Sequence, residues 1–356
     1  MVGSIVIPKT RFMEETLQNL INYKTMPYES GRRVSQDIAR VGFLATVNLR
    51  FKGVLTSKHA SKTTFTKSEM APWCLADRVR LSLNNATTIW DTTGYGAYLQ
   101  NILGRQSYVM DQVMTNSDVF AFGGTGSTVS PAGTDTPIAF NLTLRLAVND
   151  RDALGVLLLQ NDSAVLNVAV DNAPASVLMT DTDIDASISG IWEIGVEWFS
   201  VSQNPQAWPQ LNIVHQTIEQ QMPINSIGKN SLVLPRGNTY LRIINYLRVN
   251  GLLADAVDNL SLVFNLTNTP LFLSGGQIKV MHRQRYGRDL PKGTYALDFM
   301  FNGIPGMGLF RDIINSQLFS EFNEVLNISN DTVLGASNNL VSLVLEQLLE
   351  VAPVAV

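Results

Sequence analysis

The chain has 356 residues, of which 45% are hydrophobic and 16% are charged. An ordinary soluble domain has roughly 25% charged residues, so partners are expected to cover much of this surface. The net charge of −4 argues against a dedicated nucleic-acid-binding protein, and the single cysteine, Cys74, excludes an internal disulfide framework. No apolar run reaches the roughly 18 residues of a membrane-spanning helix, and the length suggests about two domains.

A short amphipathic helix is predicted over residues 10–23, which read TRFMEETLQNLINY. Thr10 is a candidate N-cap, and Glu14 and Glu15 lie in the first turns, where negative charge is favourable. The apolar side chains recur at helical spacing and form one stripe: Phe12, Met13, Leu17, Leu20 and Ile21. Because a lone helix of this length is marginal in water, it must dock on another surface to be ordered.

Basic residues flank this stripe. Residues 1–40 contain six Lys and Arg residues and four Asp and Glu residues, which gives a net charge of +2. Lys9, Arg11 and Lys24 lie closest to the apolar side chains. A basic amphipathic segment suits an anionic lipid surface or a neighbouring protein molecule. The alternative is an ordinary helix that packs on the base of its own protein.

From residue 42 onward, apolar residues alternate with polar ones, which is typical of half-buried strands. The first half of the chain has three such segments, at 42–55, 138–148 and 192–198. The second half has five segments that we interpret as strands, at 240–249, 260–266, 277–282, 294–301 and 338–351. Because each strand must bury one apolar face against another sheet, the pattern predicts β-sandwiches.

The connections divide these strands into two groups. Residues 93–104 are expected to form a short helix that ends at Gly104. Residues 123–137 form a loop rich in Gly, Ser and Thr, and residues 202–212 carry two prolines. We place the boundary between two sandwiches of similar size in the segment 202–212.

Single side chains that could carry chemistry have no partners at a recognisable spacing. The three histidines, His59, His215 and His282, lack the spacing of a metal site and are expected at the surface or in loops. Cys74 is interpreted as a small buried hydrophobic residue, because sequence places no histidine beside it as a base. The Gly-rich segment 123–126 lacks the Gly-Lys-Ser/Thr of a phosphate-binding loop.

Acidic residues form two patterns that could mark functional sites. Asp181, Asp183 and Asp185 resemble the start of a calcium loop, but the later Gly and Glu of such a loop are missing, so a solvated loop is favoured. Glu193 and Glu197 lie on one face of a strand, roughly 13 Å apart at the rise of a strand. That separation does not suit the carboxylate pair of a glycosidase. No catalytic residue, metal or cofactor is predicted.

The segment 283–299, RQRYGRDLPKGTYALDF, resembles a stretch of the major coat proteins of tectiviruses, the tailless icosahedral phages with an internal membrane. In that family a basic run leads into Asp-aromatic-Pro-Lys-Gly-x-Tyr and then a strand. Here Leu290 replaces the aromatic residue. Residues 71–103 and 152–170 are similar to further stretches of the family in the same order, so the likeness covers half of the chain.

The resemblance implies an all-β double jelly roll, which is two eight-stranded β-sandwiches side by side, with a short N-terminal helix. Residues 1–36 would form an N-terminal arm with the amphipathic helix, residues 37–205 the first jelly roll, and residues 206–356 the second. The implied function is structural and not enzymatic: a major capsid protein whose homotrimers form pseudo-hexagonal capsomers. These capsomers would build an icosahedral shell around an internal membrane.

The resemblance also implies partners and a location. The chain would contact other copies of itself, penton and minor capsid proteins, and the inner viral membrane through the N-terminal arm. Direct contact with nucleic acid is not expected. The protein would be made in the host cytoplasm and would reside in the virion capsid.

The basic run then has a structural interpretation. Arg283, Arg285 and Arg288 are expected to pair between subunits or domains, and Pro291 and Gly293 to set a turn before the strand at Tyr295. Two other functions remain open on the sequence. One is a carbohydrate-binding or glycosidase-type β-sandwich protein, which would need an aromatic platform and paired carboxylates. The other is a receptor-binding spike of the same class of virus.

Overall fold

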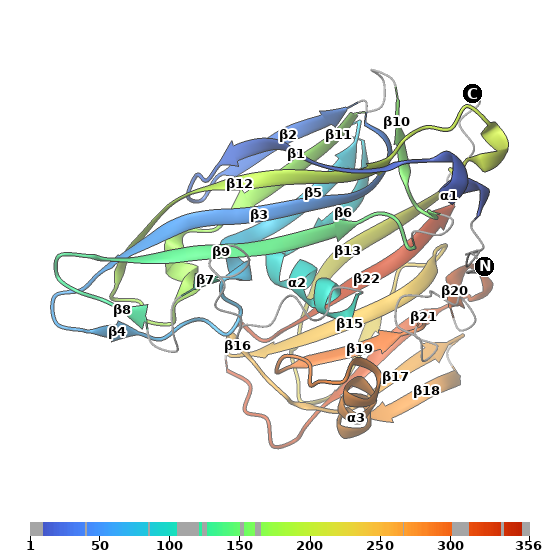
Figure 1. Cartoon of the computed structure of the whole chain (residues 1–356). Coiled ribbons are helices and arrows are strands. Elements are labelled where there is room, and N and C mark those ends of the chain that lie inside the picture. Colours follow the sequence, from blue (N-terminus) through green and yellow to red (C-terminus); the bar gives the residue numbers. More distant parts are fainter. Residues whose placement is uncertain are drawn as a thin grey trace, which may run out of the picture.

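The strands of the first half form two sheets that face each other, as the computed structural model in Figure 1 shows. The structure describes residues 10–39, 41–84, 86–104, 121–122, 127–149, 153–160, 165–265, 267–300, 313–335 and 338–350. One sheet has the order β1 (Gln18–Pro27), β12 (Asp185–Phe199), β3 (Gly42–Lys58), β9 (Thr134–Arg145) and β7 (Ala121–Phe122), with β10 (Leu157–Leu159) paired to β3. The facing strands are β6 (Thr87–Thr92), β5 (Ala76–Leu83), β11 (Val165–Asn172) and β2 (Arg33–Ala39).

The second half repeats this arrangement with its own pair of sheets. One sheet contains β13 (Ile213–Pro223), β22 (Leu340–Glu350) and β15 (Thr239–Val249), and β15 also pairs with β16 (Leu252–Leu253), β19 (Thr294–Asp298) and β20 (Ile314–Asn315). The facing sheet has the order β14 (Gly228–Val233), β21 (Phe322–Ile328), β17 (Val257–Phe264) and β18 (Asn268–Ser274). Four strands on each side, in the orders β13-β22-β15-β19 and β14-β21-β17-β18, make an eight-stranded jelly roll.

The two halves share one continuous sheet. Strands β13 and β6 pair in parallel, with Thr217 opposite Trp90 and Ile218 opposite Asp91. This pairing joins four strands of the first half to those of the second in a ten-stranded sheet. The segment 202–212 links the halves, while β13 directly after it lies beside the first half.

Three long strands carry the first half well beyond the second (Figure 1). Strand β3 pairs with β12 from Phe43 to Lys58 and with β9 from Thr46 to Ser57. Near their far end lies a small two-stranded sheet of β4 (Thr64–Phe65) and β8 (Ser127–Thr128).

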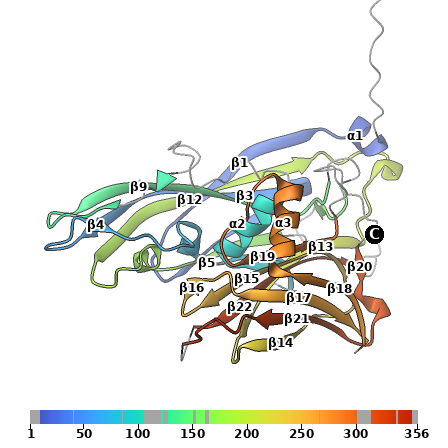
Figure 2. The ribbon, with the colours of Figure 1, turned by 90° about the horizontal axis from the view of Figure 1, so that it is seen from below.

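Three helices and four short 3-10 turns complete the described residues. Helix α1 (Arg11–Glu15) lies at the N-terminal end, and α2 (Gly94–Leu103) and α3 (Gly275–Tyr286) both lie toward the junction of the two halves (Figures 1 and 2). All ten residues of α2 are buried, so this helix is part of the core and not a surface cover. The 3-10 turns span Trp73–Leu75, Ala175–Leu178, Pro205–Ala207 and Ser316–Leu318.

Each half has its own apolar core, which is why the strands alternate as they do. The first core lies between the two sheets of the first half and includes Phe51, Trp192 and Val168, all with no exposed surface. The second core includes Tyr240 and Leu326. Tyr246 and Val344, although in second-half strands, join the first core, because alternate side chains of the shared sheet point to opposite faces.

Most of the expected elements are confirmed. The strands predicted over 42–55, 138–148 and 192–198 correspond to β3, β9 and β12, and the strand predicted over 338–351 is β22. The short helix that was expected to end at Gly104 is α2, with Thr93 as its N-cap and Gly104 as its C-cap.

The helix predicted over 10–23 is wrong beyond residue 15. The chain forms only the single turn of α1, and residues from Gln18 onward form β1, which pairs antiparallel with β12 from Gln18 opposite Phe199 to Pro27 opposite Ile191. Pairing at the edge of an existing sheet satisfies the backbone of this segment, whereas a short helix would be marginal. The residues of the predicted helical stripe are therefore divided between α1, the connection at Leu17 and the start of β1, and strands begin well before residue 37.

The strand predicted over 277–282 is also wrong, because these residues lie inside helix α3. Ser274 and Gln277 form a reciprocal capping box, in which the Ser274 hydroxyl accepts from the Gln277 N–H at 3.1 Å and the Gln277 side chain accepts from the Ser274 N–H at 2.9 Å. Gly287 ends the helix with a φ of +69°. Both local signals lie in the sequence, as Ser274 with Gln277 and as Gly287, whereas the alternation of residues 277–282 alone indicates a strand.

Candidate functional site

The basic run that resembles coat proteins begins on α3 and continues into the loop after it. Arg283 pairs with the carboxylate of Asp289 through Nε at 2.9 Å and Nη2 at 2.5 Å. Arg288 donates from Nη2 to the carbonyl oxygen of Ile102 in α2 at 3.1 Å. Arg283 therefore fixes its own loop, while Arg288 connects the second half of the chain to the first.

A second contact between the halves runs through Glu69. Its Oε1 pairs with Nζ of Lys292 at 3.1 Å, and its Oε2 accepts from the backbone N–H of Leu253 at 2.7 Å. Glu69 lies in the first half and both of its partners lie in the second. Sequence reasoning missed this residue, because a partner more than 180 residues away leaves no local pattern.

The segment 291–293 is a hydrogen-bonded turn before β19. The N–H of Thr294 donates to the carbonyl oxygen of Pro291 at 3.1 Å. Gly293 has a φ of +74°, donates its N–H to Oδ1 of Asp255 at 2.7 Å, and accepts from the N–H of Leu247 at 2.9 Å. A Cβ at this position would lie 2.8 Å from the Leu247 carbonyl oxygen, so a glycine is required for both conformation and space.

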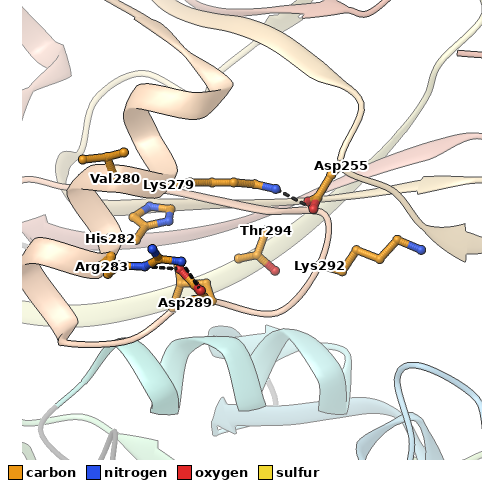
Figure 3. Close-up of a pocket in the computed structure, with 9 residues that line it drawn as sticks. Asp255, Lys279, Val280, His282, Arg283, Asp289, Lys292 and Thr294 are labelled. Atoms are coloured by element: carbon orange, nitrogen blue, oxygen red, sulfur yellow. Dashed lines mark hydrogen bonds and ion pairs between the residues drawn. The ribbon is translucent and has the colours of Figure 1, made fainter. Parts of the chain in front are cut away.

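A pocket of about 360 Å³ lies between α3 and this loop (Figure 3). Lys279 and Arg283 of α3 lie on one side, and Lys292 lies across from them. Two carboxylates complete the lining: Asp255 pairs with Lys279 at 2.5 Å, and Asp289 pairs with Arg283. The pocket is therefore lined by three cations and two anions.

His282, which also lines the pocket, is almost fully buried. Its Nε2 lies 2.9 Å from the carbonyl oxygen and 3.1 Å from the backbone nitrogen of Ala296. Burial is the main cause that lowers the pKa of His282, so the ring is neutral near pH 7. The expectation that all three histidines lie at the surface or in loops is wrong for His282 and for His215, since both lie in regular elements and both are buried.

Helix α2 is attached to the shared sheet by a buried carboxylate. Glu219 of β13 accepts hydrogen bonds from the N–H of Thr93 at 2.7 Å and from its hydroxyl at 2.8 Å, at the N-cap of α2. The Tyr246 hydroxyl donates to the other oxygen of Glu219 at 2.5 Å. Burial, followed by the Glu219 charge, raises the pKa of Tyr246, so this hydroxyl stays protonated and donates. A negative charge at a helix N-terminus is favourable, which fixes α2 across the junction.

A buried ionic cluster lies farther along the same sheet. Arg242 pairs with Glu346 at 2.8 Å and with Asp298 at 3.3 Å, and His215 lies 3.0 Å from Glu346. Burial acts to raise the pKa of Glu346, but the charge of Arg242 and the hydrogen bond with His215 lower it to about 2. Arg285, from the basic run, donates to the carbonyl oxygen of Asp298 at 3.0 Å, so it supports this cluster from α3.

The apolar side chains expected on the N-terminal arm separate into one buried anchor and several exposed residues. Phe12 packs against Phe199, with ring centroids 5.0 Å apart, and Arg11 donates from Nη1 to Oε1 of Gln206 at 2.9 Å. Leu17 and Leu20 are 73% and 70% exposed, and Met13 and Ile21 are exposed as well. Lys24 lies over the ring of Tyr23 at 5.6 Å, and Lys9 lies outside the described residues.

The acidic triplet that resembled a calcium loop is held by a lysine. Nζ of Lys62 lies 2.9 Å from Asp181 and 2.6 Å from Asp183, and His59 lies 3.2 Å from Asp183. Asp185 is separate, at the start of β12 opposite Lys58. A cationic side chain thus stands where the calcium interpretation would place a metal ion. Among the described residues, no group of three or more His, Cys, Asp or Glu could hold a metal.

The remaining residues considered for chemistry have separate structural contacts. Glu193 pairs with Arg50 at 3.0 Å, whereas Glu197 accepts a hydrogen bond from Gln18 of β1, so the two carboxylates do not form a pair. Cys74 is only half-buried, and its Sγ contacts the carbonyl oxygen of Val177 at 3.4 Å. Burial of the sulfur raises the pKa of the Cys74 thiol to about 12, so it is not a reactive thiolate near pH 7. The Gly-rich segment 123–126 lies outside the described residues.

No helix in the described ranges is long and apolar enough to cross a membrane.

Solved structures share the fold of this chain over most of its length. The crystal structure of the major capsid protein of Sulfolobus turreted icosahedral virus is similar over 94% of this chain and 97% of its own, with a TM-score of 0.69 and 12% identity. This chain has the double jelly-roll fold of viral major capsid proteins. The VP54 protein of PBCV-1 covers 98% of the chain and 96% of its own length, with a TM-score of 0.64 and 13% identity. The major capsid protein P2 of bacteriophage PM2 covers 93% and 97%, with a TM-score of 0.52 and 13% identity.

When the amino-acid sequence is compared, the chain matches no protein-family model and no curated protein. The double jelly-roll fold expected from the resemblance of 283–299 is confirmed by the backbone, although the identities are low.

Proposed function

We propose that this chain is the major capsid protein of an icosahedral virus and that it has a structural, non-enzymatic role. The observation that supports this most is the match to a viral major capsid protein over 94% of this chain, which includes both sandwiches and their junction. Two jelly rolls fused side by side give one chain two similar lateral units. A ring of three such chains then has six similar units, which is the geometry of a pseudo-hexagonal capsomer.

The proposal includes a homotrimer. Only 16% of the residues are charged, and contact between copies would cover part of this weakly charged surface. Within the trimer, residues 37–205, with β1 and the start of β2 added at the sheet edges, and residues 206–356 would act as the two jelly rolls. Arg288 would hold them at a fixed angle, Arg283 and the turn at Pro291 and Gly293 would fix the loop that carries Arg288, and Arg285 would support the second jelly roll from α3.

We assign the N-terminal segment to assembly. Its exposed apolar side chains, Met13, Leu17, Leu20 and Ile21, would face a neighbouring capsomer or the inner viral membrane, and Lys9, Arg11 and Lys24 would favour an anionic lipid surface. Phe12 would anchor the segment to its own chain. Penton and minor capsid proteins would be the other partners, in a virion made in the host cytoplasm. The net charge of −4 argues against direct binding of nucleic acid.

Sedimentation of the purified protein tests this proposal. We expect a particle with three times the mass of the 39.2 kDa chain, stable at micromolar concentration, and shells visible by electron microscopy under assembly conditions. Each copy should bury well over roughly 1,000 Å² against its neighbours, as obligate interfaces do. A monomer whose melting temperature rises with added sugar would overturn the proposal and favour a carbohydrate-binding protein. A trimer that binds host cells but never forms shells would favour a receptor-binding spike.

A further inference from the structure

The pocket between α3 and the loop 287–294 has features that a structural turn does not need. We propose that it binds a small oxyanion, in the form of a phosphate or carboxylate group. Its volume of about 360 Å³ is ample for one such group with some water. This inference is independent of the capsid function and goes beyond it.

The arrangement of charges favours an anion at the centre of the pocket. Lys279 and Arg283 are four residues apart on α3, so two like charges share one face of the helix, which is unfavourable unless anions lie close by. Lys292 lies across from them, while Asp255 and Asp289 sit near the two ends (Figure 3). An oxyanion between the three cations would share them with the three carboxylates that already pair with them, which are Asp255, Asp289 and, for Lys292, Glu69.

The existing ion pairs leave the cations able to take a ligand. The pair of Lys279 with Asp255 and the pair of Arg283 with Asp289 are both partly exposed to solvent, and exposed pairs are weak. Arg283 uses Nε and Nη2 for Asp289, and among the described residues its Nη1 has no acceptor. A guanidinium offers five N–H donors, so Arg283 can hold Asp289 and an oxyanion together.

His282 supplies a buried polar atom beside these charges. Its Nε2 is accounted for by the backbone of Ala296, whereas its Nδ1 has no partner among the described residues. A buried nitrogen without a partner is costly, and such groups in native structures commonly mark a missing ligand or water. If Nε2 accepts from the Ala296 N–H, Nδ1 carries the hydrogen, so a residue of the pocket lining has an unused donor.

The site would also strengthen the junction between the two halves. Lys292 reaches Glu69 of the first half, and Arg288 of the same loop reaches Ile102 of α2. A ligand that holds α3 and this loop together therefore restrains both contacts. Each of the three cations also pairs with a carboxylate, so an added anion must compete for them. We therefore expect a dissociation constant in the millimolar range and a rise in melting temperature on binding.

The test is a titration of the full chain with sodium phosphate, in which sodium chloride is lowered to keep the ionic strength constant. We expect saturable binding by calorimetry and a matching rise in melting temperature. The double variant Lys279→Gln/Arg283→Gln should bind phosphate at least tenfold more weakly. Lys229→Gln, which removes an exposed lysine on β14 outside the pocket, should bind phosphate as the unchanged chain does.

A second variant covers the case in which the double variant folds poorly. Val280 is exposed at the edge of the pocket, and Val280→Asp adds a negative charge there without removing an ion pair, so it should weaken phosphate binding as well. A parallel titration with acetate shows whether carboxylates bind as phosphate does. Equal phosphate binding by the unchanged chain and either variant would overturn the proposal, as would the absence of a saturable response. Neither result would affect the capsid proposal, which depends on trimer mass and shell formation.

Discussion

Gly293 and Gly287 both have positive φ, but they differ in the space around them. A Cβ on Gly293 would lie 2.8 Å from the Leu247 carbonyl oxygen and 3.0 Å from the Ala254 nitrogen, whereas nothing lies within 4 Å of a Cβ on Gly287. Gly287→Ala should therefore cost only the strain of a left-handed conformation, about 1 kcal/mol. Gly293→Ala should cost about 3 kcal/mol or more, because backbone atoms must also move.

Chemical denaturation of the two variants measures this difference, and Gly287→Ala is the control for conformational strain alone. The larger loss in Gly293→Ala should come with weaker contacts between the halves, since Lys292 precedes it in the same turn. Equal unfolding free energies in the two variants would show that the loop relaxes around the new methyl group. The close approach to Leu247 would then have no energetic role.

Glu324 is the residue whose ionisation should shape the dependence of stability on pH. It is fully buried in the second sandwich, where its Oε1 accepts from Nδ2 of Asn245 at 2.6 Å and its Oε2 has no partner among the described residues. Burial raises the pKa of Glu324 from 4.5 to about 8. Its carboxyl is thus neutral in the folded chain at pH 7, while it is ionised in the unfolded chain.

The sign of the effect follows from this difference in protonation. Below pH 4.5 the carboxyl is neutral in both states, and between about 4.5 and 8 only the unfolded chain loses the proton. The free energy of unfolding should therefore fall by up to roughly 1.4 kcal/mol for each pH unit in this window, from this residue alone. Glu324→Gln removes the titrating group, so the variant should gain stability over the parent as the pH rises from 5 to 8.

Urea denaturation of parent and variant at several pH values measures the difference directly, since contributions from other groups such as Glu346 cancel. Glu321→Gln, in the half-buried position three residues earlier, is the matched control for the change of a glutamate to glutamine. A difference between Glu324→Gln and parent that stays constant from pH 5 to 8 would contradict a neutral buried carboxyl.

At the scale of elements, the sequence was sufficient where burial repeats at a fixed period. The alternation in β3, β9, β12 and β22 predicted strands because one face of each meets an apolar core. The helical spacing of the apolar residues in 10–23 predicted the wrong structure, because the backbone from Gln18 onward pairs with β12. A partner strand some 170 residues away decides this segment, and a local pattern carries no information about it.

Helix α3 shows the opposite failure, in which the local signal was present. The capping box of Ser274 and Gln277 and the terminal Gly287 mark both ends of the helix, although its apolar face is weak. Ser274→Ala should remove one hydrogen bond to the first turn and cost about 1 kcal/mol. Loss of this cap should let the amide hydrogens of α3, the helix that carries Arg283 and Arg285, exchange faster, while those of the second core stay protected.

Hydrogen exchange followed by mass spectrometry checks this prediction. Ser226→Ala, which changes an exposed serine in the connection between β13 and β14, is the control and should leave exchange in α3 unchanged. Unaltered exchange in α3 after Ser274→Ala would mean that tertiary contacts, and not the cap, determine where this helix begins.

At the scale of the whole molecule, the junction between the halves depends on hydrogen-bonded residue pairs that no sequence pattern predicts. Glu69 with Lys292, Glu219 with Thr93, and Arg288 with Ile102 each join residues more than 120 positions apart. Sequence reasoning singled out Arg288 only through the resemblance to coat proteins. Each residue type alone is unremarkable in a strand or loop, so the two sandwiches were predictable and their attachment was not.

The exposed start of β1 offers the sharpest test of the assembly role proposed for the N-terminal segment. Deletion of this segment is uninformative, because residues 18–27 form an edge strand and its loss would expose β12. Substitution is cleaner: Leu17 and Leu20 are 73% and 70% exposed, so Leu17→Ser/Leu20→Ser should change the unfolding free energy by less than about 1 kcal/mol. The variant should form trimers that melt as the parent does.

Shell formation is where the variant should fail, because two large apolar side chains that the segment would bury against a membrane or a neighbouring capsomer are gone. The paired measurement is trimer melting temperature and particle yield by electron microscopy, with Val233→Ser as the control, since Val233 is 68% exposed on β14 at the edge of the second sandwich. Normal particles from Leu17→Ser/Leu20→Ser would show that the segment has no role in assembly. A trimer that melts early would instead place these leucines inside the capsomer, and the proposed contact with membrane or neighbours would be lost with it.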